Sequence, residues 1–122
     1  MKRRIAALVP ALAAVAIAVP LSIATPAAAH AACGTTVSDK DSSSWNKTAN
    51  GANERSGTIA SSSTNCTIKG IAYNTQNLDY HCWTLGNDGY TWTYLRNDST
   101  GVTGWVRDNL LSDNGSGVYC GF

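Results

Sequence analysis

WTYLRNDSTGVTGWVRDNLL, residues 92–111, is the stretch of this chain that decides its fold. Its two apolar segments, residues 92–95 and 102–106, carry aromatic and β-branched side chains at alternate positions, a pattern typical of strands. The six residues between them, RNDSTG, favour a turn. The sequence therefore predicts a β-hairpin. Asp108, followed by Asn-Leu-Leu, predicts a capped single turn of helix directly after it.

Several other segments outside this hairpin read as short strands separated by turns rich in Gly, Asn and Ser. The predicted strands are residues 45–49, 66–73, 78–84 and 118–120, and the loops between them include 50–57, 61–65, 86–89 and 113–117. In the segment 78–84, alternation puts Leu78, Tyr80 and Cys82 on one face and Asp79, His81 and Trp83 on the other. No segment has a sustained helical period. We expect an all-β fold, a small barrel of five to six short antiparallel strands, with Trp45 covering one end.

Residues 1–31 are typical of a secretory signal peptide that is removed on export. The first four residues, MKRR, are basic at three positions, and residues 5–29 are almost wholly apolar. Ala29-His30-Ala31 gives an A-x-A cleavage pattern, and AAA at 27–29 is a second option. A transmembrane anchor is the alternative, but prolines interrupt the segment and no basic flank follows it. We expect a secreted protein, extracellular or associated with a cell wall, with a flexible segment at 32–44 and one domain at 45–122.

The charge of the remaining chain argues against two classes of partner. Cleavage after Ala31 leaves 91 of the 122 residues, with six Lys/Arg against eight Asp/Glu, a net charge of about −2. The six basic residues are scattered, whereas binding to nucleic acid or to an anionic membrane needs clustered Lys and Arg. We therefore expect no nucleic-acid partner and no membrane contact after cleavage. We also expect a monomer.

All four cysteines lie beyond the predicted signal peptide, which in a small secreted domain implies two disulfides. Of the three possible pairings, a hairpin turning near Asn74 favours Cys66 with Cys82, because opposed residues of antiparallel strands have the Cα spacing that a disulfide tolerates. Cys33 would then pair with Cys120. Zinc is not expected, since there is no C-x-x-C motif, and the aspartates occupy turn and cap positions without the spacing of a calcium loop.

Three short motifs in this order resemble the bacterial Src-homology-3 (SH3b) domains. Asn53-Glu54-Arg55-Ser56-Gly57 is similar to that family's N-x-R-S-G segment, WTYL at 92–95 to its tryptophan-led strand, and GWV at 104–106 to its G-W-V segment. Leu110 or Leu111 would be the closing apolar residue. The cysteine-containing form is also similar to small secreted proteins of Gram-positive, actinobacterial type.

The chain departs from the family pattern at several positions. Ala52 and Glu54 stand where large aliphatic residues are usual, and Thr58 stands where a proline is usual. Glu54 is expected to be either turned to solvent or paired with Arg55 or Lys69.

The resemblance implies a non-catalytic binding module for cell-wall peptidoglycan or an extracellular peptide, with a groove lined by aromatic side chains. The candidate ligand-binding residues are Tyr80, His81, Trp83, Trp92, Trp105 and Arg55. Core packing is the competing interpretation for Trp92 and Trp105, and a loop-holding contact is the competing interpretation for Arg55. The face with Asp79, His81 and Trp83 is the preferred place for a partner.

Catalysis and inhibition of another protein are the two functional classes that compete with binding. Catalysis is not expected, because no serine is placed beside His81 and Asp79, no nucleophile motif is present, and no cofactor is implied. A secreted inhibitor or effector of another protein is the alternative function, since small disulfide-bonded β-domains are rigid. Its interacting element would be the serine-rich loop at 57–65.

Overall fold

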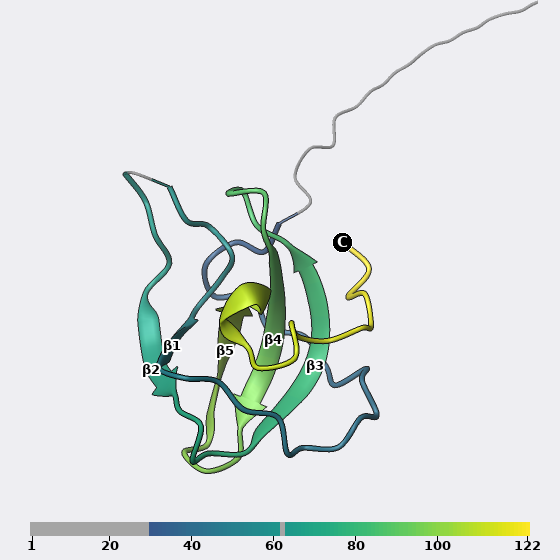
Figure 1. The fold of residues 1–122 in the computed structure, drawn as a ribbon. Coiled ribbons are helices and arrows are strands. Elements are labelled where there is room, and N and C mark those ends of the chain that lie inside the picture. The colour runs from purple at the N-terminus through teal and green to yellow at the C-terminus, as the bar shows by residue number, and fades with distance from the viewer. Residues whose placement is uncertain (1–29, 62) are drawn as a thin grey trace, which may run out of the picture.

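The computed structural model describes residues 30–61 and 63–122. The five strands in this part of the chain form one antiparallel sheet (Figure 1). The strands are β1 (Ala52–Arg55), β2 (Ile68–Ala72), β3 (Leu78–Leu85), β4 (Thr91–Asn97) and β5 (Val102–Arg107), followed by one 3-10 turn, η3 (Asp108–Leu110). Their order across the sheet is β2-β1-β5-β4-β3. The all-β prediction is confirmed, whereas all but the last two residues of the predicted signal peptide lie outside the described residues.

The hairpin predicted from residues 92–111 is confirmed as β4 and β5. Tyr94 pairs with Trp105 and Asn97 with Val102, so the connecting turn is shorter than the sequence suggested. Gly101 has a φ of +82°, which glycine adopts without steric cost. The predicted helical turn is η3. Leu111, directly after it, is buried and bridges to Ala49, so Leu111 rather than Leu110 is the closing apolar residue.

The neighbours of β2 differ from the prediction. The segment expected to be a loop, 50–57, contains β1, and β2 pairs with β1 instead of turning onto β3. The predicted strands at 45–49 and 118–120 form only isolated bridges. Lys47 bridges to Leu78 and Ala49 to Leu111 in the first segment, and Tyr119 bridges to Trp83 in the second. Trp45 is 66% exposed and therefore covers no part of the core.

The predicted disulfide pairing is wrong. The bonds join Cys33 to Cys66 and Cys82 to Cys120. The prediction assumed that residues 66–73 and 78–84 form a hairpin, but β2 and β3 are the two outer strands of the sheet and share no register. Cys82 therefore lies beside the C-terminal segment, which runs next to β3 in Figure 1.

The core consists of two adjoining clusters. One is aliphatic around Tyr80 and contains these residues: Ala49, Ala52, Ala72, Leu78, Leu95, Val106 and Leu111. The other surrounds the Cys82–Cys120 disulfide and contains Trp92, Tyr94 and Trp105. The alternation predicted for β3 is confirmed, because Leu78, Tyr80 and Cys82 are at most 1% exposed.

Glu54 is buried within this core, not turned to solvent. It is 0% exposed and accepts a hydrogen bond from Asn97 Nδ2 to Oε2 at 3.1 Å, while Oε1 has no hydrogen-bond partner. A Cβ on Gly70 would lie 2.5 Å from that oxygen, so the absence of a side chain at Gly70 makes room for the carboxyl. Burial raises the pKa of Glu54 above its ordinary value, and the Asn97 bond and the Lys69 charge oppose that rise.

Residues 30–44 contact the sheet more closely than the sequence suggested. Ala31 is 1% exposed and exchanges hydrogen bonds with Thr58, Ala31 N to Thr58 Oγ1 at 2.8 Å and Thr58 N to Ala31 O at 2.9 Å. Proline has no N–H and could not make the second bond, so Thr58 is suited to this position. Further along, Thr35 O accepts a hydrogen bond from Trp105 Nε1 at 3.0 Å.

Candidate functional site

The outer face of β3 carries Asp79, His81 and Trp83, the alternate residues that do not enter the core. All three side chains are partly exposed, as the alternation predicted. They stand on a strand whose other face is packed, so their positions are fixed by the core beneath them. We call these three residues, with Asp39 and Tyr119 from the flanking segments, the β3 face.

The backbone edge of β3 is already paired with other parts of the same chain. Lys40 N donates to His81 O at 3.0 Å on the N-terminal side. On the C-terminal side Trp83 N donates to Val118 O at 2.8 Å, and Cys120 N donates to Trp83 O at 2.9 Å. A ligand therefore cannot add as a further strand at these positions without displacing one of the two segments.

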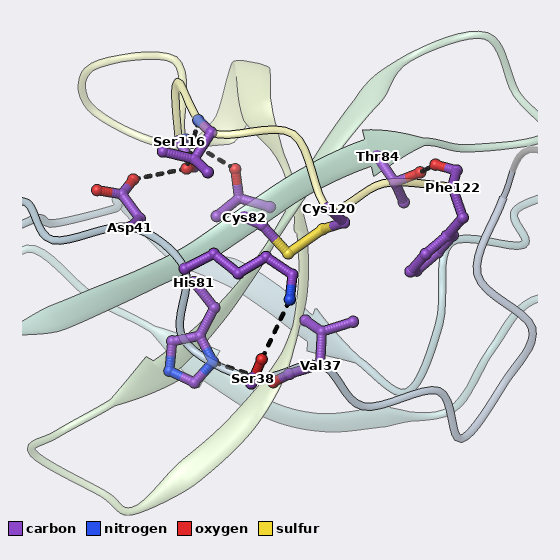
Figure 2. Close-up of a disulfide and its surroundings, with 12 residues drawn as sticks. Val37, Ser38, Asp41, His81, Cys82, Thr84, Ser116, Cys120 and Phe122 are labelled. Carbon is purple, nitrogen blue, oxygen red and sulfur yellow. Dashed lines mark hydrogen bonds between the residues drawn. A yellow bond between two sulfur atoms is a disulfide. The ribbon is translucent and has the colours of Figure 1, made fainter.

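Trp83 and Tyr119 form an aromatic pair on the β3 face. Their ring centroids lie 4.8 Å apart and Tyr119 is 49% exposed. The Cys82–Cys120 disulfide next to this pair fixes the C-terminal segment against β3 (Figure 2). Two rings held by adjacent covalent and backbone contacts present apolar surface at a low entropic cost of ordering.

His81 is held by a polar and an aromatic contact. Its Nδ1 lies 3.3 Å from Val37 O, and Figure 2 shows the other ring nitrogen facing away from that carbonyl. The ring centroid is 5.4 Å from that of Tyr94. Because a carbonyl only accepts, this contact is a hydrogen bond in the tautomer with the proton on Nδ1, and in that tautomer Nε2 is the acceptor.

Two carboxylates approach His81 on this face. Asp39, Asp79 and His81 each offer a ligand atom within 4.8 Å of those of the other two. Burial and the neighbouring charge of Asp39 raise the pKa of Asp79 above its ordinary value. The three salt bridges among the described residues use other carboxylates, those of Asp113, Asp98 and Asp88.

Only two of the predicted ligand-binding residues, His81 and Trp83, are brought together on this surface. Tyr80, Trp92 and Trp105 are at most 3% exposed and are core residues, which corrects their assignment as ligand contacts. Tyr80 uses its hydroxyl to donate to Asp113 Oδ1 at 2.6 Å. Arg55 Nη1 donates to Cys66 O at 2.8 Å, which is the loop-holding contact.

The sequence prediction missed Asp39 and Tyr119. Tyr119 precedes Cys120 and Trp83 follows Cys82, so the correct disulfide pairing would have placed the two rings together. Asp39 has no comparable signal, because the Lys40 backbone contact to β3 joins positions 41 residues apart.

No serine is hydrogen-bonded to His81 within residues 30–61 and 63–122. Ser116, a buried serine labelled in Figure 2, donates to Asp41 Oδ2 at 2.6 Å. Its hydroxyl also accepts a hydrogen bond from Val118 N at 3.1 Å. These contacts give Ser116 a role in holding the C-terminal segment.

No helix in the described part of the chain is long and apolar enough to cross a membrane. The two disulfides are typical of extracellular proteins. Comparison with protein-family models, curated proteins and solved structures finds no match to this chain.

Proposed function

We propose that this chain is a secreted, non-catalytic binding module of the SH3b type that binds cell-wall peptidoglycan or an extracellular peptide through the β3 face. The SH3b assignment rests on the motif order in the sequence. It is supported by the β4–β5 hairpin, by η3 after it and by the apolar closing residue Leu111. Export is supported by the basic-apolar leader pattern and by the two disulfides.

The observation that carries the binding proposal is the pairing of the partly exposed Trp83 with the exposed Tyr119, on the same face as His81 and Asp79. Ligand sites combine apolar or aromatic surface with a few polar groups that fix orientation. Peptidoglycan offers both partners that such a surface needs, because its sugar rings can stack on aromatic side chains and its peptide stems carry charged and amide groups. The Cys82–Cys120 disulfide holds the two rings in place before a ligand arrives, which lowers the entropic cost of binding.

The non-catalytic part of the proposal is supported by the partners of the groups that could do chemistry. The four cysteines are all in disulfides, so none supplies a thiolate. His81 faces a backbone carbonyl and two carboxylates, and Ser116 is committed to Asp41 and to the Val118 amide. A histidine base needs a nucleophile within hydrogen-bond reach.

The proposal is tested by retention of the purified protein on peptidoglycan sacculi. We expect Trp83→Ala or Tyr119→Ala to reduce retention by about two- to tenfold, because an aromatic stacking contact contributes about 0.5–1.5 kcal/mol. The matched control is Trp45→Ala, which removes a more exposed tryptophan from outside the β3 face. Equal loss in the control, or no retention of the unmodified protein on sacculi or on extracellular peptides, would refute the proposal.

Inhibition of another extracellular protein remains the second candidate function, favoured by one observation on the loop at 57–65. Ser61 N and Oγ both bond Thr64 O at 2.9 Å, and Asn65 Nδ2 donates to Ser61 O at 3.1 Å. The Cys33–Cys66 disulfide lies at the end of this loop. Capture of a secreted protease by the unmodified protein, but not by a Ser61→Ala/Asn65→Ala variant, would favour inhibition over wall binding.

A further inference from the structure

We propose that Asp39, Asp79 and His81 form a binding site for a first-row divalent transition cation of the zinc class. These residues also belong to the β3 face, but the proposal does not rest on wall binding, because metal binding is measured with the purified chain and no wall fragment. The sequence pattern itself indicates no metal site, because Asp39 lies far from Asp79 and His81 in the chain. The three residues become neighbours only when the N-terminal segment pairs with β3.

The geometry of the three ligand atoms suits a single ion. They lie within 4.8 Å of one another. A tetrahedral ion with bonds of about 2.1 Å holds its ligand atoms about 3.4 Å apart, so a small side-chain rotation is enough to close the site. Asp39 is exposed and can make that rotation, whereas Asp79 and His81 are partly buried on β3.

His81 is oriented as a metal ligand is. Metal-bound histidines use one ring nitrogen for the ion and donate the other N–H to a carbonyl or carboxylate. The Nδ1 contact with Val37 O at 3.3 Å meets this requirement in the tautomer that carries the proton on Nδ1, and in that tautomer Nε2 can ligate the ion. The packing of the ring against Tyr94 restricts its rotation.

The charges around the site favour a cation. Two carboxylates lie together, and the ammonium group of Lys40, the adjacent residue, is hydrogen-bonded to Ser38 Oγ at 3.2 Å instead. The ligand oxygens of Asp39 and Asp79 lie within 4.8 Å of each other, so the two carboxylates repel each other when both are ionised. An ion between the two carboxylates would remove that repulsion.

Of the three proposed ligands, only Asp39 also borders a surface hollow. A surface hollow of about 280 Å³ is lined by Asp39, Lys40, Asp41 and Ser42. Three protein ligands would leave a fourth coordination position for water. An imidazole together with only two carboxylates favours Zn²⁺, Co²⁺ or Ni²⁺ over Ca²⁺, which takes six to eight oxygen ligands.

The test is a titration of the purified, disulfide-bonded chain with ZnCl₂, followed by the imidazole NMR resonances of its two histidines. We expect the His81 resonances to shift with saturation and Ca²⁺ to leave them unchanged. Asp79→Asn should weaken Zn²⁺ affinity at least about tenfold, as loss of a ligand does. Zn²⁺ should also raise the melting temperature, because the ion would join the N-terminal segment to β3.

Two matched variants separate coordination from general attraction. His30→Ala removes the other histidine and should leave binding intact. Asp98→Asn removes a nearby charge that acts on Asp79 through space but is outside the ligand set, and it should change the affinity less than about threefold. The proposal is overturned if millimolar Zn²⁺ leaves His81 unshifted, if His30→Ala abolishes binding, or if Asp98→Asn weakens it as much as Asp79→Asn. The melting transition of each variant shows that it is folded.

Discussion

Glu54→Gln should stabilise this protein at neutral pH, even though the carboxylate accepts a hydrogen bond. Glu54 is 0% exposed, and only one of its oxygens has a hydrogen-bond partner, Asn97 Nδ2 at 3.1 Å. A glutamine oxygen can accept the same bond from Asn97. The substitution therefore keeps the shape and the bond and removes the buried charge.

The sign and size of the effect follow from proton linkage. Burial raises the pKa of folded Glu54 above the ordinary value of 4.5, so the folded state binds its proton more tightly than the unfolded chain. The cost of ionisation is therefore absent below pH 4.5, grows as the pH rises through the folded pKa and is constant above it. Each unit by which the pKa is raised corresponds to about 1.4 kcal/mol. Glutamine places an amide NH₂ where the unpaired Oε1 lies, so that atom's pairing does not improve and the gain at pH 7 comes from the removed charge alone, on the order of 1 kcal/mol or more in favour of the variant.

The assay is urea unfolding of the oxidised protein and of Glu54→Gln between pH 4 and pH 8. The two proteins should have equal stability near pH 4 and diverge above it, with the glutamine variant more stable and its pH dependence flatter. A gain of 1 kcal/mol corresponds to about 4–8 °C in melting temperature for a domain of this size. A glutamine variant that is less stable at pH 7, or one with the same pH dependence as the unmodified protein, would show that pairing with Asn97 and Lys69 outweighs burial.

Three further predictions concern the disulfides, the Tyr80 contact and the N-terminus. The double variant Cys82→Ser/Cys120→Ser should lower the free energy of unfolding, measured in urea, by about 4 kcal/mol. Removing the Cys33–Cys66 disulfide should lower it by nearly the same amount, because the two sequence separations, 38 and 33 residues, are similar. Non-reducing peptide mapping checks the pairing. Tyr80→Phe should cost about 1–2 kcal/mol at pH 7. Burial alone would raise the pKa of Asp113, but its contacts with Tyr80 and Lys47 lower it from the ordinary value of 3.8. The stability that the Tyr80 bond contributes is therefore present above pH 3.8 and lost as the pH falls through the lower pKa of the folded state. Equal acid sensitivity of the unmodified protein and Tyr80→Phe would contradict this prediction. Intact mass of the exported chain should place its first residue at His30 rather than at residue 32, because cleavage after residue 31 would remove a buried core residue.

The local elements of the fold could be predicted from the sequence because their signals are local. Alternation along residues 78–84 identified both faces of β3, and the turn residues 96–101 located the β4–β5 hairpin. The sequence also showed that Thr58 stands where the pattern it resembles usually has proline. The reason was not visible there, because the partner of the Thr58 N–H is Ala31, 27 residues away.

The candidate site was predicted only where one strand carries it. His81 and Trp83 were named because they share a face of one segment. Tyr80, Trp92 and Trp105 were also named as ligand contacts, because an aromatic residue in a strand has the same pattern whether it lines a groove or fills a core. Burial decides between these interpretations, and burial depends on the whole fold.

By itself the sequence determined the all-β class, the hairpin at 92–111, the two faces of β3 and the presence of two disulfides. Only the tertiary structure decided which strands are neighbours, and with them the cysteine pairing, the burial of Glu54 and the meeting of Asp39 with Asp79 and His81. The physical reason is the sequence separation over which the two kinds of interaction act. Periodicity and turn chemistry act over a few residues, whereas strand order depends on how all the apolar faces are buried together.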